Sequence, residues 1–324
     1  MDTLLQVKDL SVFFKTSEAN IKVLKELCYQ LNAGETLSIV GESGSGKTVH
    51  ALSILRLMST NAKITGEIIF KNENLSVLPE SKLKNIRGKK IAMIFQDPMT
   101  SLNPVMTIGS QIYETLLTHK KATKKNIKEK TLSLLKSVEI PDAKKKLDSY
   151  PHEFSGGQRQ RIMIAMALAC EPDILIADEP TTALDVTIQK QILALLKKLQ
   201  EERKTALIFI THNLALVNEL GGRVLVLYAG QCVEECTTEQ LFKRPLHPYS
   251  QGLIACAAGI TQKGRLKTIE GTPPAPGTIF EGCPFEPRCP KKLERCKFQN
   301  PEMFNLGQRK SRCWLNANEE YLGD

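Results

Sequence analysis

The spacing of apolar residues changes several times along the chain. Residues 3–14 and 22–31 alternate or cluster β-forming residues, and short apolar runs follow at 36–40 and 91–95. From 106 to about 170 the spacing becomes helical. Beyond that point short apolar runs such as "DILIAD" alternate with helical segments. Strands that alternate with helices indicate an α/β fold with a mainly parallel sheet covered by helices.

Two breaks in this alternation predict the domain organisation. The helical stretch from about 98 to 170 predicts an inserted α-helical subdomain. Between 258 and 282 the segment "GTPPAPG" stiffens the chain and discourages both helix and strand. We therefore predict one domain over 1–258 and a small cysteine-bearing extension over 259–324.

Composition and charge exclude several classes of protein. The 324 residues are 42% hydrophobic and 24% charged, which is ordinary for a globular protein. No apolar run reaches the roughly 18 residues of a membrane helix, and "MDTLLQVKDL" does not resemble a signal peptide. Much of the net charge of +9 lies in lysine runs between 119 and 148. Such runs could bind nucleic acid or an anionic membrane surface. Because no aromatic residues interleave them for base stacking, we expect a solvated helical face and no nucleic-acid partner.

A glycine-rich loop follows the apolar run at 36–40. "GESGSGKT" fits the pattern G-x-x-x-x-G-K-[ST] at every position and lies between a predicted strand and a predicted helix. Its glycines let the backbone wrap around phosphate oxygens, while its amides and the helix N-terminus supply positive charge. Lys47 then reaches the β- and γ-phosphates, and the Thr48 hydroxyl binds Mg²⁺. The predicted nucleotide-binding residues of the loop are Gly41, Ser43, Gly44, Ser45, Gly46, Lys47 and Thr48.

Polar residues at the ends of three other predicted strands suit hydrolysis of that nucleotide. Asp178, at the end of "DILIAD", is a candidate Mg²⁺ ligand, and the adjacent Glu179 can orient and deprotonate an attacking water. Gln96, in "FQDP", is expected to contact Mg²⁺ or that water and to sense the γ-phosphate. His212, in "FITHN", is expected to contact the γ-phosphate. We therefore predict Glu179, His212 and Gln96 as the catalytic residues.

A second serine-glycine turn opens onto a helix at "EFSGGQRQR". Ser155 suits an N-cap, Gly156 and Gly157 leave the backbone bare, and such a helix N-terminus favours an anion. The turn lacks a lysine and a metal-binding hydroxyl, so it can complete a phosphate site but cannot form one alone. We therefore predict head-to-tail pairing, in which Ser155, Gly156, Gly157 and Gln158 cap the γ-phosphate held by a partner.

These motifs, in this order and spacing, resemble the ATP-binding cassette ATPases over about residues 1–258. The resemblance implies a P-loop NTPase core of the RecA-like type with an N-terminal antiparallel β subdomain, and ATP and Mg²⁺ as cofactors. It also implies that "FSGGQ" acts in trans and that Asp185, in "TTALD", couples the two sites. Phe14 is expected to stack on adenine, with Phe13 as the alternative. Asn213 departs from the family, which often has aspartate there, and the departure bears on coupling between the sites.

Longer segments narrow the resemblance to one group of importers. "YPHEFSGGQRQR", "SLNPVMTIGSQI", "ALDVTIQ" and "RPLHPYSQGLI" resemble the ATPase subunits of bacterial oligopeptide, dipeptide and nickel importers, and "GTPPAPG…GCPFEPRCP" resembles their C-terminal extension. The resemblance implies a peripheral protein at the cytoplasmic face of the inner membrane. Its implied partners are a second, paralogous ATPase, two membrane permeases and an extracytoplasmic solute-binding protein. The alternative is a soluble ABC ATPase that acts on DNA or ribosomes, although neither a coiled-coil insertion nor a second cassette is seen.

Four cysteines crowd the tail, separated by five, six and sixteen residues. Without a CxxC pair the spacing alone is a weak metal signal. A reducing cytosol disfavours disulfides, and a bound metal would stabilise a short proline-rich segment. Tetrahedral zinc and a [4Fe–4S] cluster both fit, and the resemblance favours the cluster. The predicted ligands are Cys283, Cys289, Cys296 and Cys313.

Overall fold

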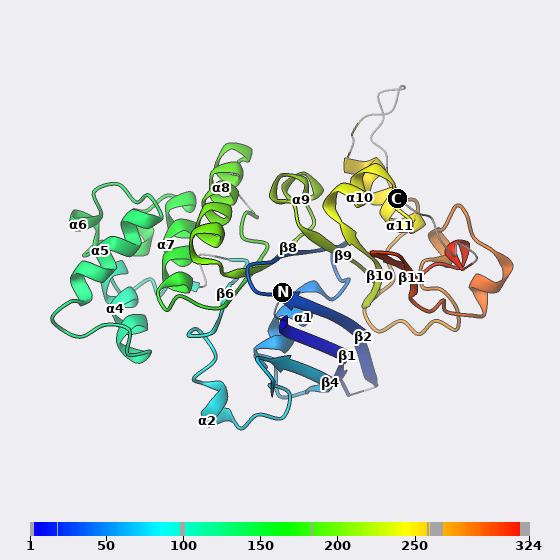
Figure 1. The fold of residues 1–324 in the computed structure, drawn as a ribbon, viewed down its shortest axis with the longest axis horizontal. Coiled ribbons are helices and arrows are strands. Elements are labelled where there is room, and N and C mark those ends of the chain that lie inside the picture. The colour runs from blue at the N-terminus through cyan, green and yellow to red at the C-terminus, as the bar shows by residue number, and fades with distance from the viewer. Residues whose placement is uncertain are drawn as a thin grey trace. The chain divides into compact units, whose positions relative to one another are not determined.

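The structure is a computed structural model that describes residues 3–17, 19–97, 101–182, 184–257, 259 and 268–317 (Figure 1). The chain forms two compact units, each with its own core, which we call the helical unit and the P-loop unit. The helical unit consists of Asn32–Glu35 and Leu78–Phe209. The P-loop unit consists of Thr3–Leu31, Thr36–Val77 and the chain from Ile210 onward.

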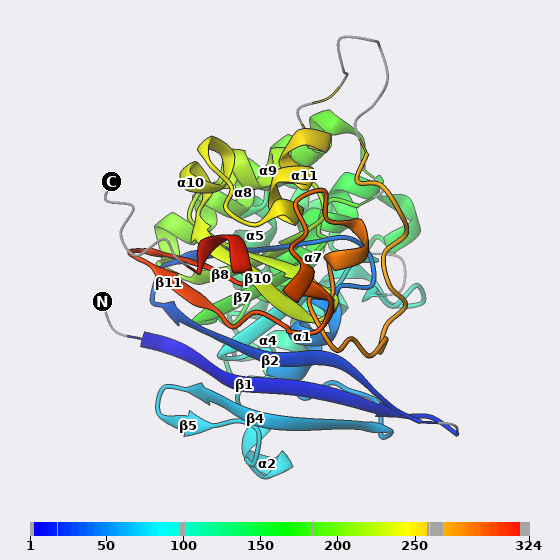
Figure 2. The same cartoon turned by 90° about the vertical axis from the view of Figure 1, so that its right-hand side faces the viewer.

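The N-terminal part of the P-loop unit is a four-stranded antiparallel sheet. Its strands, in the order β2-β1-β4-β5, are Asn20–Asn32, Thr3–Lys15, Ala62–Phe70 and Glu73–Asn74. Figure 2 shows β1, β2 and β4 side by side in one layer. In β2 the buried residues Leu27, Tyr29 and Leu31 alternate with exposed ones, as expected when one face of a sheet is packed and the other is solvated.

A second sheet supports the glycine-rich loop of the P-loop unit. Its strands run in the order β11-β12-β10-β9-β3, and β3 pairs parallel to β9. The bounds are β3 Thr36–Val40, β9 Arg223–Tyr228, β10 Gln231–Thr237, β11 Phe304–Leu306 and β12 Arg309–Ser311. The helices are α1 Lys47–Ile54, α9 Leu214–Leu220, α10 Thr238–Lys243 and α11 Pro248–Ala257. Strands β11 and β12 come from the tail, so the C-terminal extension continues the sheet.

The tail also contributes to the hydrophobic core of the P-loop unit. Phe285 is buried in a cluster with residues of β3, β9, β10 and α9. Its ring lies 5.2 Å from Tyr228 and 5.4 Å from Tyr249, measured between centroids. Aromatic contacts at this spacing add to the hydrophobic stabilisation of burial. The extension is therefore packed into the unit that carries the glycine-rich loop.

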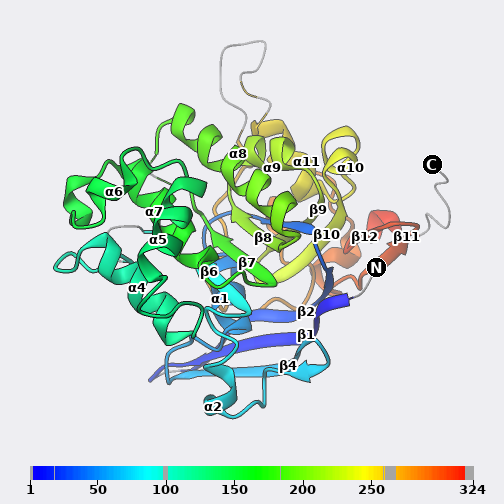
Figure 3. The same ribbon diagram turned by 60° about the vertical axis from the view of Figure 1, so that its left-hand side comes forward.

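The helical unit contains its own strands and most of the helices. Its strands, in the order β8-β7-β6, are Ala206–Thr211, Ile174–Asp178 and Ile91–Ile94, with β6 and β7 parallel. All residues of β7 and β8 are buried, as expected for a sheet covered on both faces. The helices are α2 Glu80–Leu83, α4 Ile108–Thr118, α5 Ile127–Ser137, α6 Ala143–Lys146, α7 Gly156–Leu168 and α8 Val186–Arg203. Figure 3 shows α4 to α7 gathered together at one end of this unit.

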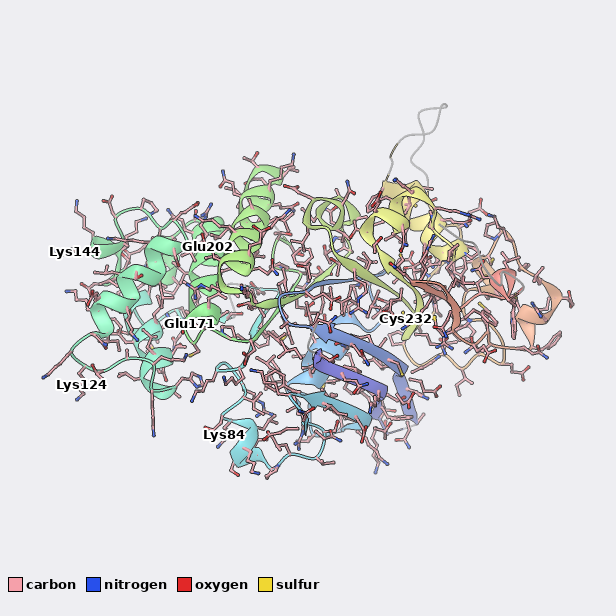
Figure 4. The ribbon with its side chains drawn as sticks, viewed as in Figure 1. Lys84, Lys124, Lys144, Glu171, Glu202 and Cys232 are labelled. Carbon is pink, nitrogen blue, oxygen red and sulfur yellow. The ribbon has the colours of Figure 1, made fainter. Side chains whose placement is uncertain are left out.

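The lysine runs lie on these peripheral helices and loops. Lys124 and Lys144 are exposed and point outward in Figure 4. This placement agrees with the expected solvated helical face. Across the described ranges, no helix is both long and apolar enough to cross a bilayer.

The predicted fold class is confirmed, with an antiparallel β subdomain, an inserted helical subdomain and a small cysteine-bearing extension on a P-loop core. The boundaries at 98–170 and at 258–259 stay predictions.

Candidate nucleotide site

The glycine-rich loop joins β3 to α1, and backbone geometry explains its glycines. Gly44 has φ +80° and Gly46 has φ +100°, in the region that residues with a side chain rarely adopt. Gly46 is the N-cap of α1, and among the described residues no side chain caps that helix. The first amides of α1 are therefore left for a ligand, which is the arrangement that suits phosphate.

Lys47 is held against the loop. Its Nζ donates hydrogen bonds to the carbonyl oxygens of Gly41 (2.8 Å) and Glu42 (2.9 Å), and its side chain is buried. Ser45 is buried as well, whereas Ser43 and Thr48 are exposed. The hydroxyls of Ser43 and Thr48 are therefore open to solvent, whereas the Lys47 ammonium group is hydrogen-bonded to the backbone of the loop.

A buried histidine in α1 joins this helix to strand β2. The ring of His50 accepts or donates a 2.8 Å hydrogen bond at Nε2 with the Tyr29 hydroxyl. Burial lowers the pKa of His50 to about 3, because a charged imidazole would lose its hydration there. His50 therefore stays neutral at physiological pH and supports the helix by packing and this single hydrogen bond.

The predicted catalytic carboxylate lies in the helical unit, directly after β7. Asp178 is buried at the end of the strand, and Glu179 follows at φ +46°, a strained backbone conformation for a non-glycine residue. Glu179 Oε2 accepts hydrogen bonds from Gln96 Nε2 (3.2 Å) and from Thr182 Oγ1 (2.9 Å). The structure thus brings Gln96 and Glu179 together.

Thr182 is a residue that the sequence reasoning missed. Its signal was present, because a hydroxyl residue stands three positions after Glu179, and the turn is closed by a hydrogen bond from Thr182 N to Glu179 O (3.2 Å). The side chain of Thr182 then reaches back to the carboxylate.

The second serine-glycine turn begins α7. Ser155 is its N-cap: the hydroxyl oxygen accepts from Gln158 N, and Gln158 Oε1 accepts from Ser155 N, each at 3.3 Å. This reciprocal pair is a capping box. A Cβ on Gly157 would lie 2.8 Å from Ile188 of α8, so close helix packing requires glycine there.

Two further predicted residues cap helices. Asp185 Oδ1 accepts from Ile188 N (3.0 Å) at the start of α8, and Asn213 Oδ1 accepts from Ala215 N (3.0 Å) at the start of α9. Because asparagine and aspartate are equally good N-caps, Asn213 keeps this role without the charge. His212, just before Asn213, is exposed at the end of β8.

The candidates for adenine stacking lie near the end of β1. Phe13 and Phe14 are both half-buried. Phe13 lines a hollow with Asn20 and Asn61, and the Lys22 ammonium lies 5.6 Å from its ring centroid. The choice between Phe14 and Phe13 stays a prediction.

The metal prediction for the tail was wrong. The four tail cysteines line one small cavity together with Phe285 and Trp314. However, no three cysteine, histidine or carboxylate side chains are placed to hold a metal ion in the described part of the chain. Burial raises the pKa of Cys283 to about 12 and that of Cys313 to about 11, which favours neutral thiols that pack as small apolar groups. Neither the [4Fe–4S] cluster nor zinc at Cys283, Cys289, Cys296 and Cys313 is supported.

Comparisons with known proteins agree with the motifs. Residues 24–182 match the family model described as "ABC transporter". The dimeric structure of MJ0796, a bacterial ABC transporter cassette, is 32% identical with a TM-score of 0.65, covering 72% of this chain and 99% of that one. The same cassette in a post-hydrolysis state, bound to ADP and Pi, gives the same values. The fold and these matches therefore define an ATP-binding cassette ATPase.

Further relatives match along nearly the whole chain. Residues 233–296 match the model described as "Oligopeptide/dipeptide transporter, C-terminal region". The dipeptide transport ATP-binding protein DppD of Haemophilus influenzae is 48% identical over 98% of this chain and 97% of its own. The oligopeptide transport ATP-binding protein OppD of Escherichia coli is 47% identical over 95% of this chain and 92% of its own. The chain belongs to this family of peptide-transporter ATP-binding proteins.

The family settles three predictions. The chain is an ATP-hydrolysing subunit of an ABC transporter, with ATP as its nucleotide, as predicted. The resemblance to the peptide-importer ATPases is confirmed. The alternative, an ATPase that acts on DNA or ribosomes, is not supported by any of these relatives.

Proposed function

We propose that this protein hydrolyses ATP to drive the uptake of dipeptides or oligopeptides through separate membrane permeases. The observation that carries the proposal is the 48% identity over 98% of the chain to a dipeptide transport ATP-binding protein, tail included. Nickel or another small solute is the second candidate cargo. The partners we propose are two permeases and an extracytoplasmic solute-binding protein, with this chain attached peripherally at the cytoplasmic face of the inner membrane.

The loop from Gly41 to Thr48 is proposed to bind the phosphates of ATP. Open amides at the start of α1 and the inward-held Lys47 support this role. Thr48, Gln96 and Asp178 offer hydroxyl, amide and carboxylate oxygens, the hard donors that Mg²⁺ prefers. When bound, the ion offsets the negative charge of the phosphate oxygens.

Glu179 is proposed as the general base of hydrolysis. Hydrogen bonds from Gln96 and Thr182 to one carboxylate oxygen restrict the rotation of the side chain and fix its direction. A proton passes from water to this carboxylate while the water oxygen bonds to the γ-phosphorus. The bond between that phosphorus and the β–γ bridging oxygen breaks, which leaves ADP and phosphate. His212 is proposed to contact a γ-phosphate oxygen.

The turn at Ser155–Gln158 is proposed to cap the γ-phosphate of a partner ATPase, a paralogue of this chain. Its supports are the capped N-terminus of α7 and the dimeric state of the related cassette MJ0796. Asp185 is proposed to lie in the segment that couples the two sites. We also propose that 1–258 is the nucleotide-binding domain and 259–324 the transporter-specific extension.

A reconstituted transporter tests the cargo. The complete complex in proteoliposomes, given the binding protein with peptide, is expected to hydrolyse ATP several times faster than with the binding protein alone. The control is the same binding protein with nickel. Stimulation by nickel and not by any dipeptide or oligopeptide would overturn peptide as the cargo.

The general base is tested by Glu179→Gln in the same complex. We expect turnover to fall about 10²- to 10⁴-fold while ATP binding is kept, because the amide cannot accept the proton. ATP should then hold the two ATPases of the complex in the closed state, which retention of labelled ATP through gel filtration detects. Thr182→Val is the matched control and should lower turnover far less. Normal turnover by Glu179→Gln would show that the base is assigned wrongly.

A further inference from the structure

One residue of the tail reaches the nucleotide-binding loop. Arg288 Nη1 lies 2.7 Å from Glu42 Oε2, and Arg288 Nη2 lies 3.0 Å from Glu42 Oε1. Glu42 is the second residue of the loop "GESGSGKT". The Arg288 side chain is only 5% exposed and that of Glu42 25% exposed. This parallel, two-pronged geometry is the strong form of an arginine–carboxylate pair.

The rest of the guanidinium is also held by the P-loop unit. Arg288 Nε donates to the carbonyl oxygen of Glu270 (3.0 Å), and Nη2 donates to that of Ile269 (3.4 Å). Nη1 lies 3.4 Å from the Tyr228 hydroxyl, next to the core that contains Phe285. The planar group therefore has little freedom and can serve as a fixed anchor.

Glu42 is fixed through its backbone as well. Its amide donates to the Tyr249 hydroxyl (2.9 Å), and its carbonyl oxygen accepts from Lys47 Nζ (2.9 Å) and Ser45 N (3.2 Å). Glu42 therefore contacts both Arg288, through its carboxylate, and Lys47, through its carbonyl oxygen. The tail approaches the loop at a second point, because Pro276 would lie 3.8 Å from a Cβ on Gly44.

We propose that Arg288 is a positioning residue for ATP, by which the C-terminal extension sets the shape and charge of the nucleotide-binding loop. The proposal rests on the assignment of Gly41–Thr48 as that loop. Two physical effects carry it. The anchor restrains a glycine-rich segment whose ordering would otherwise oppose binding. The guanidinium also neutralises the Glu42 carboxylate, which unpaired would repel a triphosphate.

The charge effect gives a distinctive test in the purified full-length chain, with MgATP binding as the readout. Arg288→Gln leaves Glu42 charged and unpaired, so we expect the Kd for ATP to rise about 3- to 30-fold, within the range of directly coupled pairs. Glu42→Gln also weakens the anchor, but it removes the repelling charge, so its Kd should rise less than that of Arg288→Gln. In the Glu42→Gln background, Arg288→Gln should then have little further effect.

A second tail arginine offers a matched control. Arg309 Nη2 lies 3.0 Å from the buried Glu234 Oε1 and joins the tail to β10 and not to the loop. Arg309→Gln should lower thermal stability, as Arg288→Gln does, and should leave the Kd for ATP unchanged. In the assembled transporter, Arg288→Gln should raise the KM for ATP and leave kcat nearly unaltered, whereas Arg309→Gln should leave the KM unchanged.

Three outcomes separate the possibilities. An unchanged Kd in Arg288→Gln would overturn the inference. Equal weakening of ATP binding by Arg309→Gln would also overturn it, because any loosening of the tail would then be enough. A third contrary result would be an effect of Arg288→Gln on Kd that is just as large in the Glu42→Gln background. Lys47→Ala, measured alongside, tests the loop itself. If Lys47→Ala bound ATP normally, the proposed nucleotide site would fail, whereas weak binding there with normal binding by Arg288→Gln would overturn only the role of Arg288.

Discussion

Helices α1 and α7 both have a glycine at or next to their N-cap, yet their N-termini are capped differently. The N-cap of α1 is Gly46, with no capping side chain in the described structure, and Lys47 lies over the loop. The N-cap of α7 is Ser155, which forms a capping box with Gln158. One helix end is thus open to a ligand, and the other is already closed by its own side chains.

In the proposed head-to-tail pairing, this difference would let two anion-binding turns share one nucleotide. The open turn of α1, with its ammonium, can bind a triphosphate unaided. In the closed turn the Ser155 oxygen is occupied as an acceptor from Gln158 N, but a hydroxyl that accepts can still donate its own proton. The α7 turn therefore suits a single contact to a phosphate that another loop already holds.

Within this comparison, the largest predicted effects come from disrupting each turn separately. Lys47→Ala should weaken ATP binding by the isolated chain about 10- to 100-fold, the cost of losing one hydrogen bond to a charged group. Ser155→Asp should leave that binding unchanged. It keeps a good N-cap, but it removes the hydroxyl donor and adds a negative charge, so the assembled transporter should lose about 10²-fold in ATPase rate.

Equilibrium binding to the isolated chain and steady-state ATPase of the complex check this pair. Ser155→Thr is the conservative control, since it keeps both the cap and the hydroxyl. If Ser155→Asp weakened ATP binding by the isolated chain, the turn would belong to the chain's own loop and the division between the turns would be wrong.

Sequence reasoning found the elements whose chemistry is local. Gly44, Gly46 and Lys47 follow from one eight-residue pattern, and Ser155 follows from the preference of serine for N-caps. The strand that ends at Asp178 follows from its apolar run. In each case the residues that specify the feature are neighbours in the sequence.

Features that depend on distant segments could not be predicted. The pair of Glu42 and Arg288 spans 246 positions, and no periodic pattern connects them. The tail cysteines illustrate the opposite error. Their crowding predicted a metal site, but side-chain direction decides whether thiols can share an ion, and spacing without CxxC does not fix that direction.

The two turns should also differ in their tolerance of alanine. Gly44 has φ +80°, and a Cβ there would meet Pro276 at an ordinary contact distance of 3.8 Å, so Gly44→Ala costs about 1–2 kcal/mol of backbone strain without a clash and should weaken ATP binding as the loop relaxes. Gly156 is helical, and a Cβ there would lie 3.4 Å from Leu184. Gly156→Ala should therefore change the free energy of unfolding by no more than about 0.5 kcal/mol.

Urea denaturation and ATP binding on the same preparations measure both variants. The assembled complex adds a further readout, since Gly156→Ala should lower its ATPase rate while the isolated chain binds ATP normally. Equal destabilisation by the two alanines would mean that Gly156, like Gly44, is needed for its backbone conformation, although its helical φ does not require glycine.

Buried histidines make the stability of the P-loop unit depend on pH. Helix α1 buries His50 with a pKa of about 3, and His247 elsewhere in the P-loop unit has its pKa lowered to about 3 by burial too. The buried residues of α7 include Gln160 but no titratable group. Between pH 6.5 and 3 the unfolded chain binds a proton at each histidine and the folded chain does not. Stability from these residues is therefore complete above about pH 6.5 and is lost as the pH falls, by up to about 1.4 kcal/mol per pH unit for each.

His50→Gln, whose amide nitrogen takes the place of the imidazole Nε2, isolates the part of this pH dependence that belongs to α1. The amide can still hydrogen-bond to the Tyr29 hydroxyl, so the fold is kept while the titration is removed. In urea melts between pH 7 and 5, the variant should lose less stability than the parent chain by about 1–2 kcal/mol, and His247 should account for a similar share of what remains. Parallel pH profiles for the variant and the parent chain would show that His50 is protonated in the folded state. The packing of α1 against Tyr29 would then have to accommodate a charged imidazole, and the helix behind the loop would be more open to water than its burial implies.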